Sequence, residues 1–321
     1  MRVLVTGGAG FIGSHFSKMA LSGELGGISF VRIIDKFTYS GLRSNLESIQ
    51  GLKNFELFEG DISNPDDVRK SCEGIDAVIN FAAESHVDRS ISNAAEFIRT
   101  NVDGVRVLLE RCRELNIRLV QVSTDEVYGS ISEGSWTETF PLEPNSPYSA
   151  SKAAGDLLAR SFNRTFGTDV VITRCSNNYG PSQFPEKVIP LFITNLLQGL
   201  NVPLYGNGKN IRDWLHVTDH CRAIELALTK GKSGEIYNVG GGRELTNIEL
   251  TDTILGELGF NREKIQYVDD RKGHDLRYSV DWEKARRELG YEPQVKFETG
   301  ISETVTWYRQ NKSWWEPLKK L

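Results

Sequence analysis

Short apolar runs alternate with longer amphipathic stretches through the first half of the chain. The runs are rich in branched and aromatic side chains and cover residues 3–5, 30–34, 55–58, 77–81, 119–122 and 170–173. Runs that are apolar throughout are typical of strands covered on both faces, as in a parallel sheet. The stretches between them predict helices over residues 11–21, 65–72, 94–115 and 148–166. We therefore expect an α/β fold with a Rossmann-type, doubly wound parallel sheet.

The pattern changes after Gly180, where frequent prolines and glycines divide the chain into shorter pieces. A helix at 216–228 and a strand at 235–239 are expected to return to the main sheet. Further helices are expected at 248–258, 282–289 and 297–310. We predict one domain of residues 1–180 plus about 212–240, which return to the sheet. A smaller C-terminal lobe would comprise residues 181–211 and 241–321.

Charge and composition exclude several classes of function. A net charge of -5 argues against sequence-independent binding of nucleic acid, which needs a basic surface. No apolar run approaches the ~20 residues that a membrane helix requires. A strand is expected directly after Met1, leaving no room for a signal peptide, so we expect a cytoplasmic protein. Cys72, Cys112, Cys175 and Cys221 form no C-x-x-C pair and are expected to be buried free thiols. No His, Cys and Asp cluster has metal-site spacing.

Glycines at 7, 10 and 13 follow the first apolar run and open the first expected helix. Gly7 permits a tight turn, Gly10 lets the backbone approach a pyrophosphate, and Gly13 allows close packing of the helix on the sheet. Asp35 ends the next strand, where an acid can bind the adenosine ribose hydroxyls and repel a ribose phosphate. The pattern predicts a site for NAD rather than NADP. Asp61 is placed either beside the adenine or as a helix cap, and the spacing leaves both open.

Tyr148 and Lys152 lie four residues apart, on one face of an expected helix. The charge of Lys152 is expected to favour the phenolate and lower the pKa of Tyr148, making it a usable base near neutrality. The alternative is an exposed tyrosine beside a surface lysine.

Two adjacent acids, Asp125 and Glu126, follow a buried strand at the edge where open α/β sheets bind their ligands. Adjacent carboxylates usually cap a helix or face solvent. Beside the tyrosine and lysine they instead supply what an elimination needs, a base for a carbon-bound proton and an acid for a departing hydroxyl. Burial and the charge of Glu126 are expected to raise the pKa of Asp125, which must be protonated to donate.

The glycine spacing, the segment at 80–83 and the Tyr148–Lys152 pair resemble the extended short-chain dehydrogenase/reductase family. Over nearly the whole chain the match is to the dTDP-glucose 4,6-dehydratases, in the segments 82–90, 122–129, 177–181, 185–190, 205–208, 212–214 and 270–275. The chain's length resembles the shorter versions associated with biosynthesis of antibiotic deoxysugars. Leu42 departs from the family, which usually has asparagine there.

The resemblance implies a lyase that converts dTDP-glucose to dTDP-4-keto-6-deoxyglucose. It implies that Tyr148 takes the proton of the sugar's 4-hydroxyl while carbon 4 is transiently oxidised by NAD. Glu126 would then remove the proton on carbon 5, and Asp125 would protonate the leaving 6-hydroxyl. Hydride return to carbon 6 completes the cycle. Lys152 would assist Tyr148, and Thr124 stands in the place of the family's catalytic Ser or Thr.

The resemblance and the motifs together give the remaining site residues. The expected cofactor-binding residues are Gly7, Gly10, Phe11, Ile12, Gly13, Asp35, Lys36, Thr38, Gly41, Asp61, Ile62, Phe81, Ala82, Ala83, Ser85, Thr100, Tyr148, Lys152 and Asn178. The expected substrate-binding residues are Ser85, His86, Thr124, Asn177, Glu186, Lys187, Val188, Pro203, Tyr205, Arg212, Asn247, Arg271 and His274.

Several alternatives stay open. Arg212 and Arg271 either clamp the substrate pyrophosphate or form structural ion pairs. His86 is a residue of the pocket or of the packing around it. The long helices at 94–115 and 148–166 either pair across a homodimer, as in the family, or are buried within one chain. A 4-epimerase, a decarboxylase, a dehydratase for a GDP sugar and a non-catalytic NAD-sensing protein are the rival functions.

Overall fold

Seven parallel strands form the main sheet of the computed structural model, which describes residues 1–270 and 273–320. In spatial order they are β10 (Ile236–Val239), β6 (Val170–Cys175), β5 (Arg118–Thr124), β4 (Ala77–Asn80), β1 (Arg2–Thr6), β2 (Phe30–Asp35) and β3 (Phe55–Glu59). The order reverses direction between β1 and β4, so the predicted doubly wound Rossmann-type fold is confirmed.

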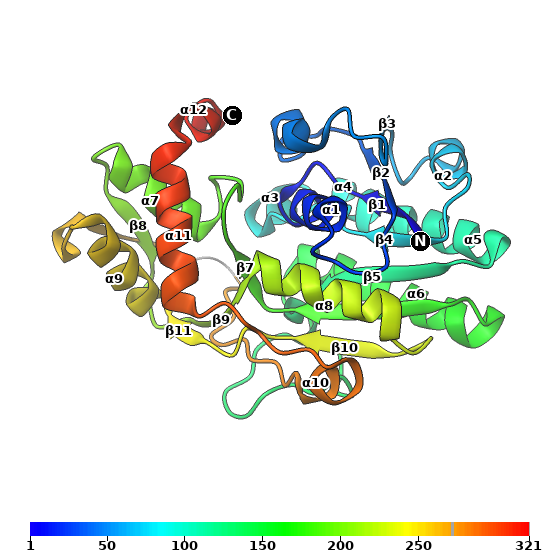
Figure 1. Ribbon diagram of the computed structural model, residues 1–321. Coiled ribbons are helices and arrows are strands. Elements are labelled where there is room, and N and C mark those ends of the chain that lie inside the picture. The colour runs from blue at the N-terminus through cyan, green and yellow to red at the C-terminus, as the bar shows by residue number, and fades with distance from the viewer. Residues whose placement is uncertain (271–272, 321) are drawn as a thin grey trace.

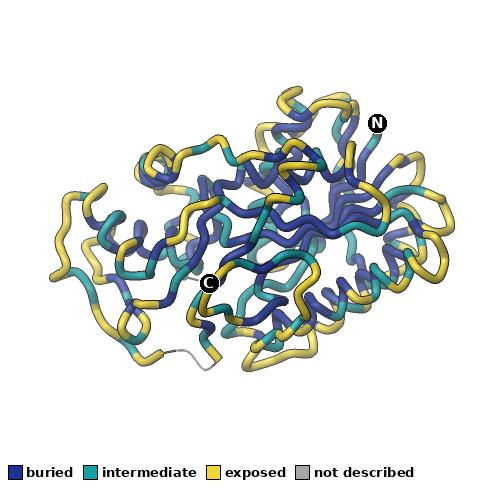
Figure 2. The backbone as a smooth tube through the Cα atoms, turned by 90° about the horizontal axis from the view of Figure 1, so that it is seen from below, coloured by how far each residue is buried: buried dark blue, intermediate teal, exposed yellow. Residues whose placement is uncertain are grey.

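Helices cover both faces of this sheet (Figure 1). One face packs against α1 (Phe11–Ser22) and α8 (Val217–Lys230), with α10 (Glu283–Leu289) near the edge, and the other against α2 (Pro65–Ser71), α5 (Val105–Leu115) and α6 (Pro147–Phe166). Along β1, Val3 and Val5 enter the core beside α1 and α8, whereas Leu4 enters the core beside α5 and α6. Figure 2 shows that most of the main sheet is buried. Because successive side chains of a strand enter two apolar layers in turn, the buried strands appear in the sequence as continuous apolar runs.

A second region lies beyond the carboxyl ends of the strands, on the left of Figure 1. Its sheets contain β7 (Asn177–Tyr179), β9 (Ile211–His216) and β11 (Glu244–Thr246), and separately β8 (Val202–Tyr205) and β12 (Ile265–Val268). Its helices are α7 (Val188–Leu197), α9 (Asn247–Leu258), α11 (Phe297–Gln310) and α12 (Lys312–Trp315). These helices share a core of their own around Phe192, Ile254 and Ile301.

The chain passes between the two regions repeatedly. After β6 it enters the second region, and it rejoins the main sheet through α8 and β10. It leaves again for β11 and α9. Later α10, which the predicted division assigns to the smaller lobe, packs against β10 and α8. The division into residues 1–180 with about 212–240, against 181–211 with 241–321, stays a prediction.

The single helix expected at 94–115 is instead three pieces. α4 (Ala95–Ile98) leads into a π-helical turn, η2 (Arg99–Gly104), before α5 begins. Here α6 approaches closely, since a Cβ atom on Gly155 would lie 2.7 Å from the main-chain oxygen of Asn101. The widened turn also places Thr100 in the groove described below. The remaining short elements are α3 (Val87–Ser92) and the 3-10 turns η1 (Arg43–Ile49), η3 (Asp125–Tyr128), η4 (Arg262–Lys264) and η5 (Pro317–Lys320).

No helix among the described residues combines the length and apolar character needed to cross a membrane.

Candidate active site

A groove runs along the carboxyl edge of the main sheet, across the point where the strand order reverses. Open α/β sheets bind their ligands in this position. The groove begins at the turn between β1 and α1, where Gly7 adopts a φ of 62° in the left-handed region. A Cβ atom on Gly13 would lie 2.5 Å from the Gly7 carbonyl oxygen, so glycine is required for the helix to pack this closely. No side chain caps the N-terminus of α1, whose backbone N–H groups are thus suited to a pyrophosphate.

Asp35 lies at the end of β2, on the same groove. Its Oδ2 accepts a hydrogen bond from the Ala9 N–H at 2.9 Å, and its Oδ1 accepts one from the Phe37 N–H at 2.8 Å. Each carboxylate oxygen can accept a further bond, so both ribose hydroxyls could be bound. A Cβ atom on Gly41 would lie 2.6 Å from Oδ1, so glycine keeps this side of the carboxylate accessible.

The groove brings together all the predicted cofactor-binding residues. It is lined by Gly7, Gly10, Phe11, Ile12, Gly13, Asp35, Lys36, Thr38, Gly41, Asp61, Ile62, Phe81, Ala82, Ala83, Ser85, Thr100, Tyr148, Lys152 and Asn178. Of the two alternatives for Asp61, the helix cap is excluded, because the side chain of Asn64 caps α2. Asp61 instead faces the groove, with its Oδ2 3.8 Å from the Lys36 Nζ. The residues present therefore fit a dinucleotide.

Tyr148 and Lys152 project from the first turns of α6 into the same groove. Pro147 begins this helix, and Ser146 and Ser149 form a reciprocal capping box that fixes its start. Lys152 is buried, and its Nζ donates a hydrogen bond to the Val122 carbonyl at 2.7 Å.

The pKa of Tyr148 differs from the sequence expectation. Burial, followed by the charges of Glu126 and Cys175, raises the pKa of the phenol well above its ordinary value. A hydrogen bond with Thr124 opposes this shift but does not reverse it. The expectation of a lowered pKa was wrong because it counted the charge of Lys152 and ignored desolvation, which disfavours the phenolate.

Asp125 and Glu126 open the 3-10 turn η3, directly after β5. The hydroxyl of Thr124 caps this turn by accepting a hydrogen bond from the Glu126 N–H at 3.3 Å. Asp125 is 1% exposed, and its Oδ2 has no hydrogen-bond partner within the described part of the chain. Burial, and then the charge of Glu126, raises the pKa of Asp125 well above its usual range. This carboxyl is therefore suited to hold a proton, as the sequence predicted.

A second cavity adjoins the groove and opens toward α7, β8 and β9. The predicted substrate residues that line it are Ser85, His86, Asn177, Glu186, Lys187, Val188, Pro203, Tyr205, Arg212, Asn247 and His274. Thr124 lines the groove instead, and Arg271 lies outside the described residues. Glu126 lines both spaces, so the acid pair lies where the groove and the cavity meet.

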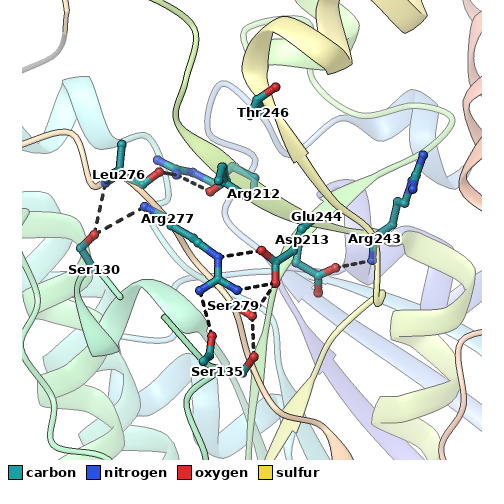
Figure 3. A network of polar contacts seen from close by, with 12 residues as sticks. Ser130, Ser135, Arg212, Asp213, Arg243, Glu244, Thr246, Leu276, Arg277 and Ser279 are labelled. Atoms are coloured by element: carbon teal, nitrogen blue, oxygen red, sulfur yellow. Dashed lines mark hydrogen bonds and ion pairs between the residues drawn. The ribbon is translucent and has the colours of Figure 1, made fainter. Parts of the chain in front are cut away.

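Arg212 of β9 is held by the segment around Leu276, which Arg277 in turn ties to β11 (Figure 3). Its Nη2 donates to the Asp275 carbonyl at 2.9 Å, and its guanidinium carbon lies 4.0 Å from the centre of the Tyr278 ring. Nearby, Arg277 holds Glu244 of β11 through two hydrogen bonds of 2.7 and 2.8 Å. Arg212 is thus held by main-chain carbonyls while it lines the cavity, and its role as a pyrophosphate clamp stays a prediction.

Contacts across the mouth of the groove join the two regions. The Tyr39 hydroxyl donates to Glu186 Oε1 at 2.9 Å, and the Arg89 guanidinium stacks on the Tyr39 ring at 3.6 Å. His86 caps α3 and lies 3.5 Å from the other oxygen of Glu186, so it belongs to the cavity wall. Lys187 Nζ donates to the Ser85 carbonyl at 2.9 Å.

Sequence reasoning missed several residues of the site. Leu191, Trp214 and Tyr278 line the cavity with apolar and aromatic surface. The side-chain oxygen of Asn101 in η2 accepts a hydrogen bond from the Glu84 N–H at 3.0 Å, and its nitrogen donates one to the Ser151 hydroxyl at 2.9 Å. These two bonds connect the groove wall to α6. No local pattern marks these residues, since their partners are distant in the chain. Within residues 1–270 and 273–320, no group of three or more His, Cys, Asp or Glu side chains could hold a metal ion.

A dinucleotide groove that ends at a tyrosine–lysine pair is the arrangement of the extended short-chain dehydrogenases, and the geometry places the chain in that class. The family model described as GDP-mannose 4,6 dehydratase matches residues 4–304.

Individual relatives match over nearly the whole chain. A dTDP-glucose 4,6-dehydratase of Streptomyces niveus is 56% identical, covering 99% of this chain and 96% of the relative. A dTDP-glucose 4,6-dehydratase from Streptomyces venezuelae, crystallised with NAD and TYD bound, gives a TM-score of 0.98 at 55% identity, over 99% of this chain and 100% of that one. UDP-glucose 4-epimerase of Thermus thermophilus, in complex with NAD, gives 0.88 at 33% identity, over 97% and 100%. The chain belongs to the dTDP-glucose 4,6-dehydratase family.

Proposed function

We propose that the chain dehydrates dTDP-glucose to dTDP-4-keto-6-deoxyglucose, as an NAD-dependent hydro-lyase. The observation that carries the proposal is the pair of buried Asp125 and half-buried Glu126, which lies where the cofactor groove meets the second cavity. The Streptomyces venezuelae relative, solved with NAD and TYD, supports both the cofactor and a thymidine-type substrate. The epimerase shares the fold, so the fold alone does not decide between the two reactions.

Each catalytic group has a defined task in this reaction. The groove around Gly10, Gly13 and Asp35 would hold NAD, which would supply a hydride acceptor for carbon 4 of the sugar and, once reduced, a hydride donor for carbon 6. Tyr148 takes the proton of the 4-hydroxyl. Burial disfavours the phenolate that this requires, and the positive charge of buried Lys152 on the same helix opposes that penalty. The 4-ketone acidifies the proton on carbon 5, which Glu126 removes. Asp125, kept protonated by burial and by its neighbour, gives its proton to the departing 6-hydroxyl, and water leaves.

The second cavity would hold the nucleotide. Arg212 would bind the diphosphate, Asn177 and Glu186 would contact the sugar, and the apolar surface around Leu191 would contact the base. Arg271 is proposed as a second clamp from its sequence context alone.

The test is incubation of the purified protein with dTDP-glucose, UDP-glucose and GDP-mannose, with product masses measured for the loss of one water. The double variant Asp125→Asn with Glu126→Gln serves as the inactive control. We expect water loss from dTDP-glucose and little or none from the others. Faster dehydration of GDP-mannose, or epimerisation without water loss, would assign the chain to a rival function.

We also propose a homodimer built on α5 and α6. Their inner faces are buried under the sheet, which covers much of the apolar surface seen in the sequence. Leu157 and Phe166 of α6 nevertheless remain 52% and 51% exposed. In analytical sedimentation, the wild type should behave as a dimer, and Leu157→Glu should dissociate to monomer at higher protein concentration than the wild type does. Equal monomeric masses would contradict the proposal.

We propose a cytoplasmic location, which is supported by four buried free thiols at Cys72, Cys112, Cys175 and Cys221. Cell fractionation tests it.

A further inference from the structure

A buried ion pair lies behind the proposed catalytic groups and takes no part in the mechanism above. Arg174 of β6 donates through Nε to Asp156 Oδ2 of α6 at 2.9 Å, and the two side chains are 1% and 0% exposed. Removing two charges from water costs roughly as much free energy as their attraction returns, so a buried pair is weak evidence for a stabilising role. Its presence suggests a role in fixing geometry.

The pair is extended by Tyr128, the last residue of η3. Arg174 Nη1 donates to the Tyr128 hydroxyl at 2.8 Å, and that hydroxyl donates to Asn238 Oδ1 of β10 at 2.8 Å. The ring of Tyr128 also stacks on the ring of Trp136, with the two ring centroids 5.2 Å apart. Both the polar and the apolar parts of Tyr128 are therefore fixed.

Two members of this network, Tyr128 and Asp156, are near neighbours of proposed catalytic groups. Tyr128 closes the four-residue turn that Asp125 and Glu126 open. Asp156 follows Lys152 by one turn of α6, and its carboxylate opposes the lowering of the Lys152 pKa that burial causes. The network thus joins the element that carries the elimination acids to the helix that carries the oxidation pair.

We propose that Tyr128, Arg174 and Asp156 are positioning residues, which hold the Asp125–Glu126 turn against α6 so that both pairs of groups face one substrate. The inference rests on the function proposed above. The two elements depend on the network unequally. α6 is a 20-residue helix with its own capping box and the bond from Asn101 to Ser151, whereas η3 is a four-residue turn with a single capping bond, from the Glu126 N–H to the Thr124 hydroxyl. Loosening Tyr128 should therefore displace the elimination acids more than the oxidation pair.

Tyr128→Phe keeps the ring and its stacking on Trp136 and removes only the hydroxyl. We expect elimination to slow about tenfold, because small displacements of catalytic groups are costly, while oxidation at carbon 4 stays within about twofold of wild type. Reduced nicotinamide should then accumulate during turnover, and its absorbance is the readout. Tyr291→Phe is the matched control, because it also removes the hydroxyl of a buried tyrosine. It loses one hydrogen bond, to the Gly240 carbonyl at 2.7 Å, whereas Tyr128→Phe loses two. Tyr291→Phe should change the melting temperature without accumulation.

Arg174→Lys gives a second test, because lysine keeps the charge opposite Asp156 but cannot hold Asp156 and Tyr128 in one fork. It should show the same accumulation, and the double variant with Tyr128→Phe should be no slower than the slower single variant. If both steps slow equally in each single variant, the network only stabilises the fold and the proposal is wrong. If the wild type does not dehydrate dTDP-glucose at all, the proposed function fails instead, and the two failures are thereby distinguished.

Discussion

Replacing Asp125 with asparagine should separate the two halves of the reaction. The side chain is buried, and its Oδ1 accepts a hydrogen bond from the Thr124 hydroxyl at 3.2 Å, so an amide of the same shape can occupy the space. An amide cannot release a proton to the departing hydroxyl. A general acid typically contributes about 10²–10⁴-fold, so elimination should fall within that range while carbon 4 is still oxidised.

The same substitution should raise stability, and the sign follows from the pKa. Burial, and then Glu126, raises the pKa of Asp125 well above its value in an unfolded chain, about 3.9. Such an acid costs folding free energy once the pH exceeds the unfolded value, and the cost grows until the pH reaches the folded value. Asp125→Asn removes this cost, so the variant should melt at a higher temperature than wild type at neutral pH. Below about pH 4 the difference should disappear, because the wild-type carboxyl is then protonated in both states.

Stopped-flow absorbance of reduced nicotinamide and solvent-deuterium uptake at carbon 5 would follow the two steps, and thermal melts across pH would follow stability. Asp219→Asn is the control, since Asp219 is also 1% exposed and accepts hydrogen bonds from the Gln294 and Val295 N–H groups. It should lower the melting temperature and leave the balance of the two steps unchanged. Dehydration by Asp125→Asn at the wild-type rate would refute the proton-donor role. A lower melting temperature at neutral pH would refute the argument from the raised pKa.

Further substitutions test the groove and the oxidation step. Tyr148→Phe should lose orders of magnitude in turnover while still binding substrate, since only a transition-state role is removed, and near-normal turnover would contradict the assignment. Asp35→Ala should weaken NAD binding in a fluorescence titration, and NADP binding by the wild type as tight as NAD binding would overturn its role. Gly13→Ala should weaken NAD binding and lower the melting temperature, because its Cβ would lie 2.5 Å from the Gly7 oxygen. Gly256→Ala is its control, because a Cβ atom there, in the last turn of α9, meets nothing within 4 Å, and alanine should stabilise that helix by up to about 1 kcal/mol. Equal effects of the two alanines would show that the close packing of α1 is unimportant.

The main sheet could be predicted because its strands are apolar on both sides, which leaves a continuous signal in the sequence. β7 and β11 are only three residues long and carry mixed side chains, so no periodic pattern marks them. The π turn η2 was missed for a different reason. Its residues match a helix throughout, and the widened turn accompanies a contact with Gly155, distant in the sequence.

The cofactor groove was predictable because its residues come from short segments that each follow a strand, so that the order of the strands places them together. The network of Tyr128, Arg174 and Asp156 was not, since those residues meet only after three elements have packed. The pKa of Tyr148 was missed because the sequence displays the nearby charge of Lys152 but gives no measure of burial.

Recombination between this gene and that of a relative at a single point near Gly180 would not join two independent modules. It would divide one hydrophobic core between the two parents. The layer packed on one face of the main sheet includes Leu215 and Ile224, near the start and in the middle of the segment that returns through α8, and Leu289 of α10. A truncated product would leave β6 as a bare edge strand, which can pair with other chains. Substrate preference is therefore expected to have diversified by point changes in the cavity wall, or by exchanges with several junctions, rather than by swapping one continuous block.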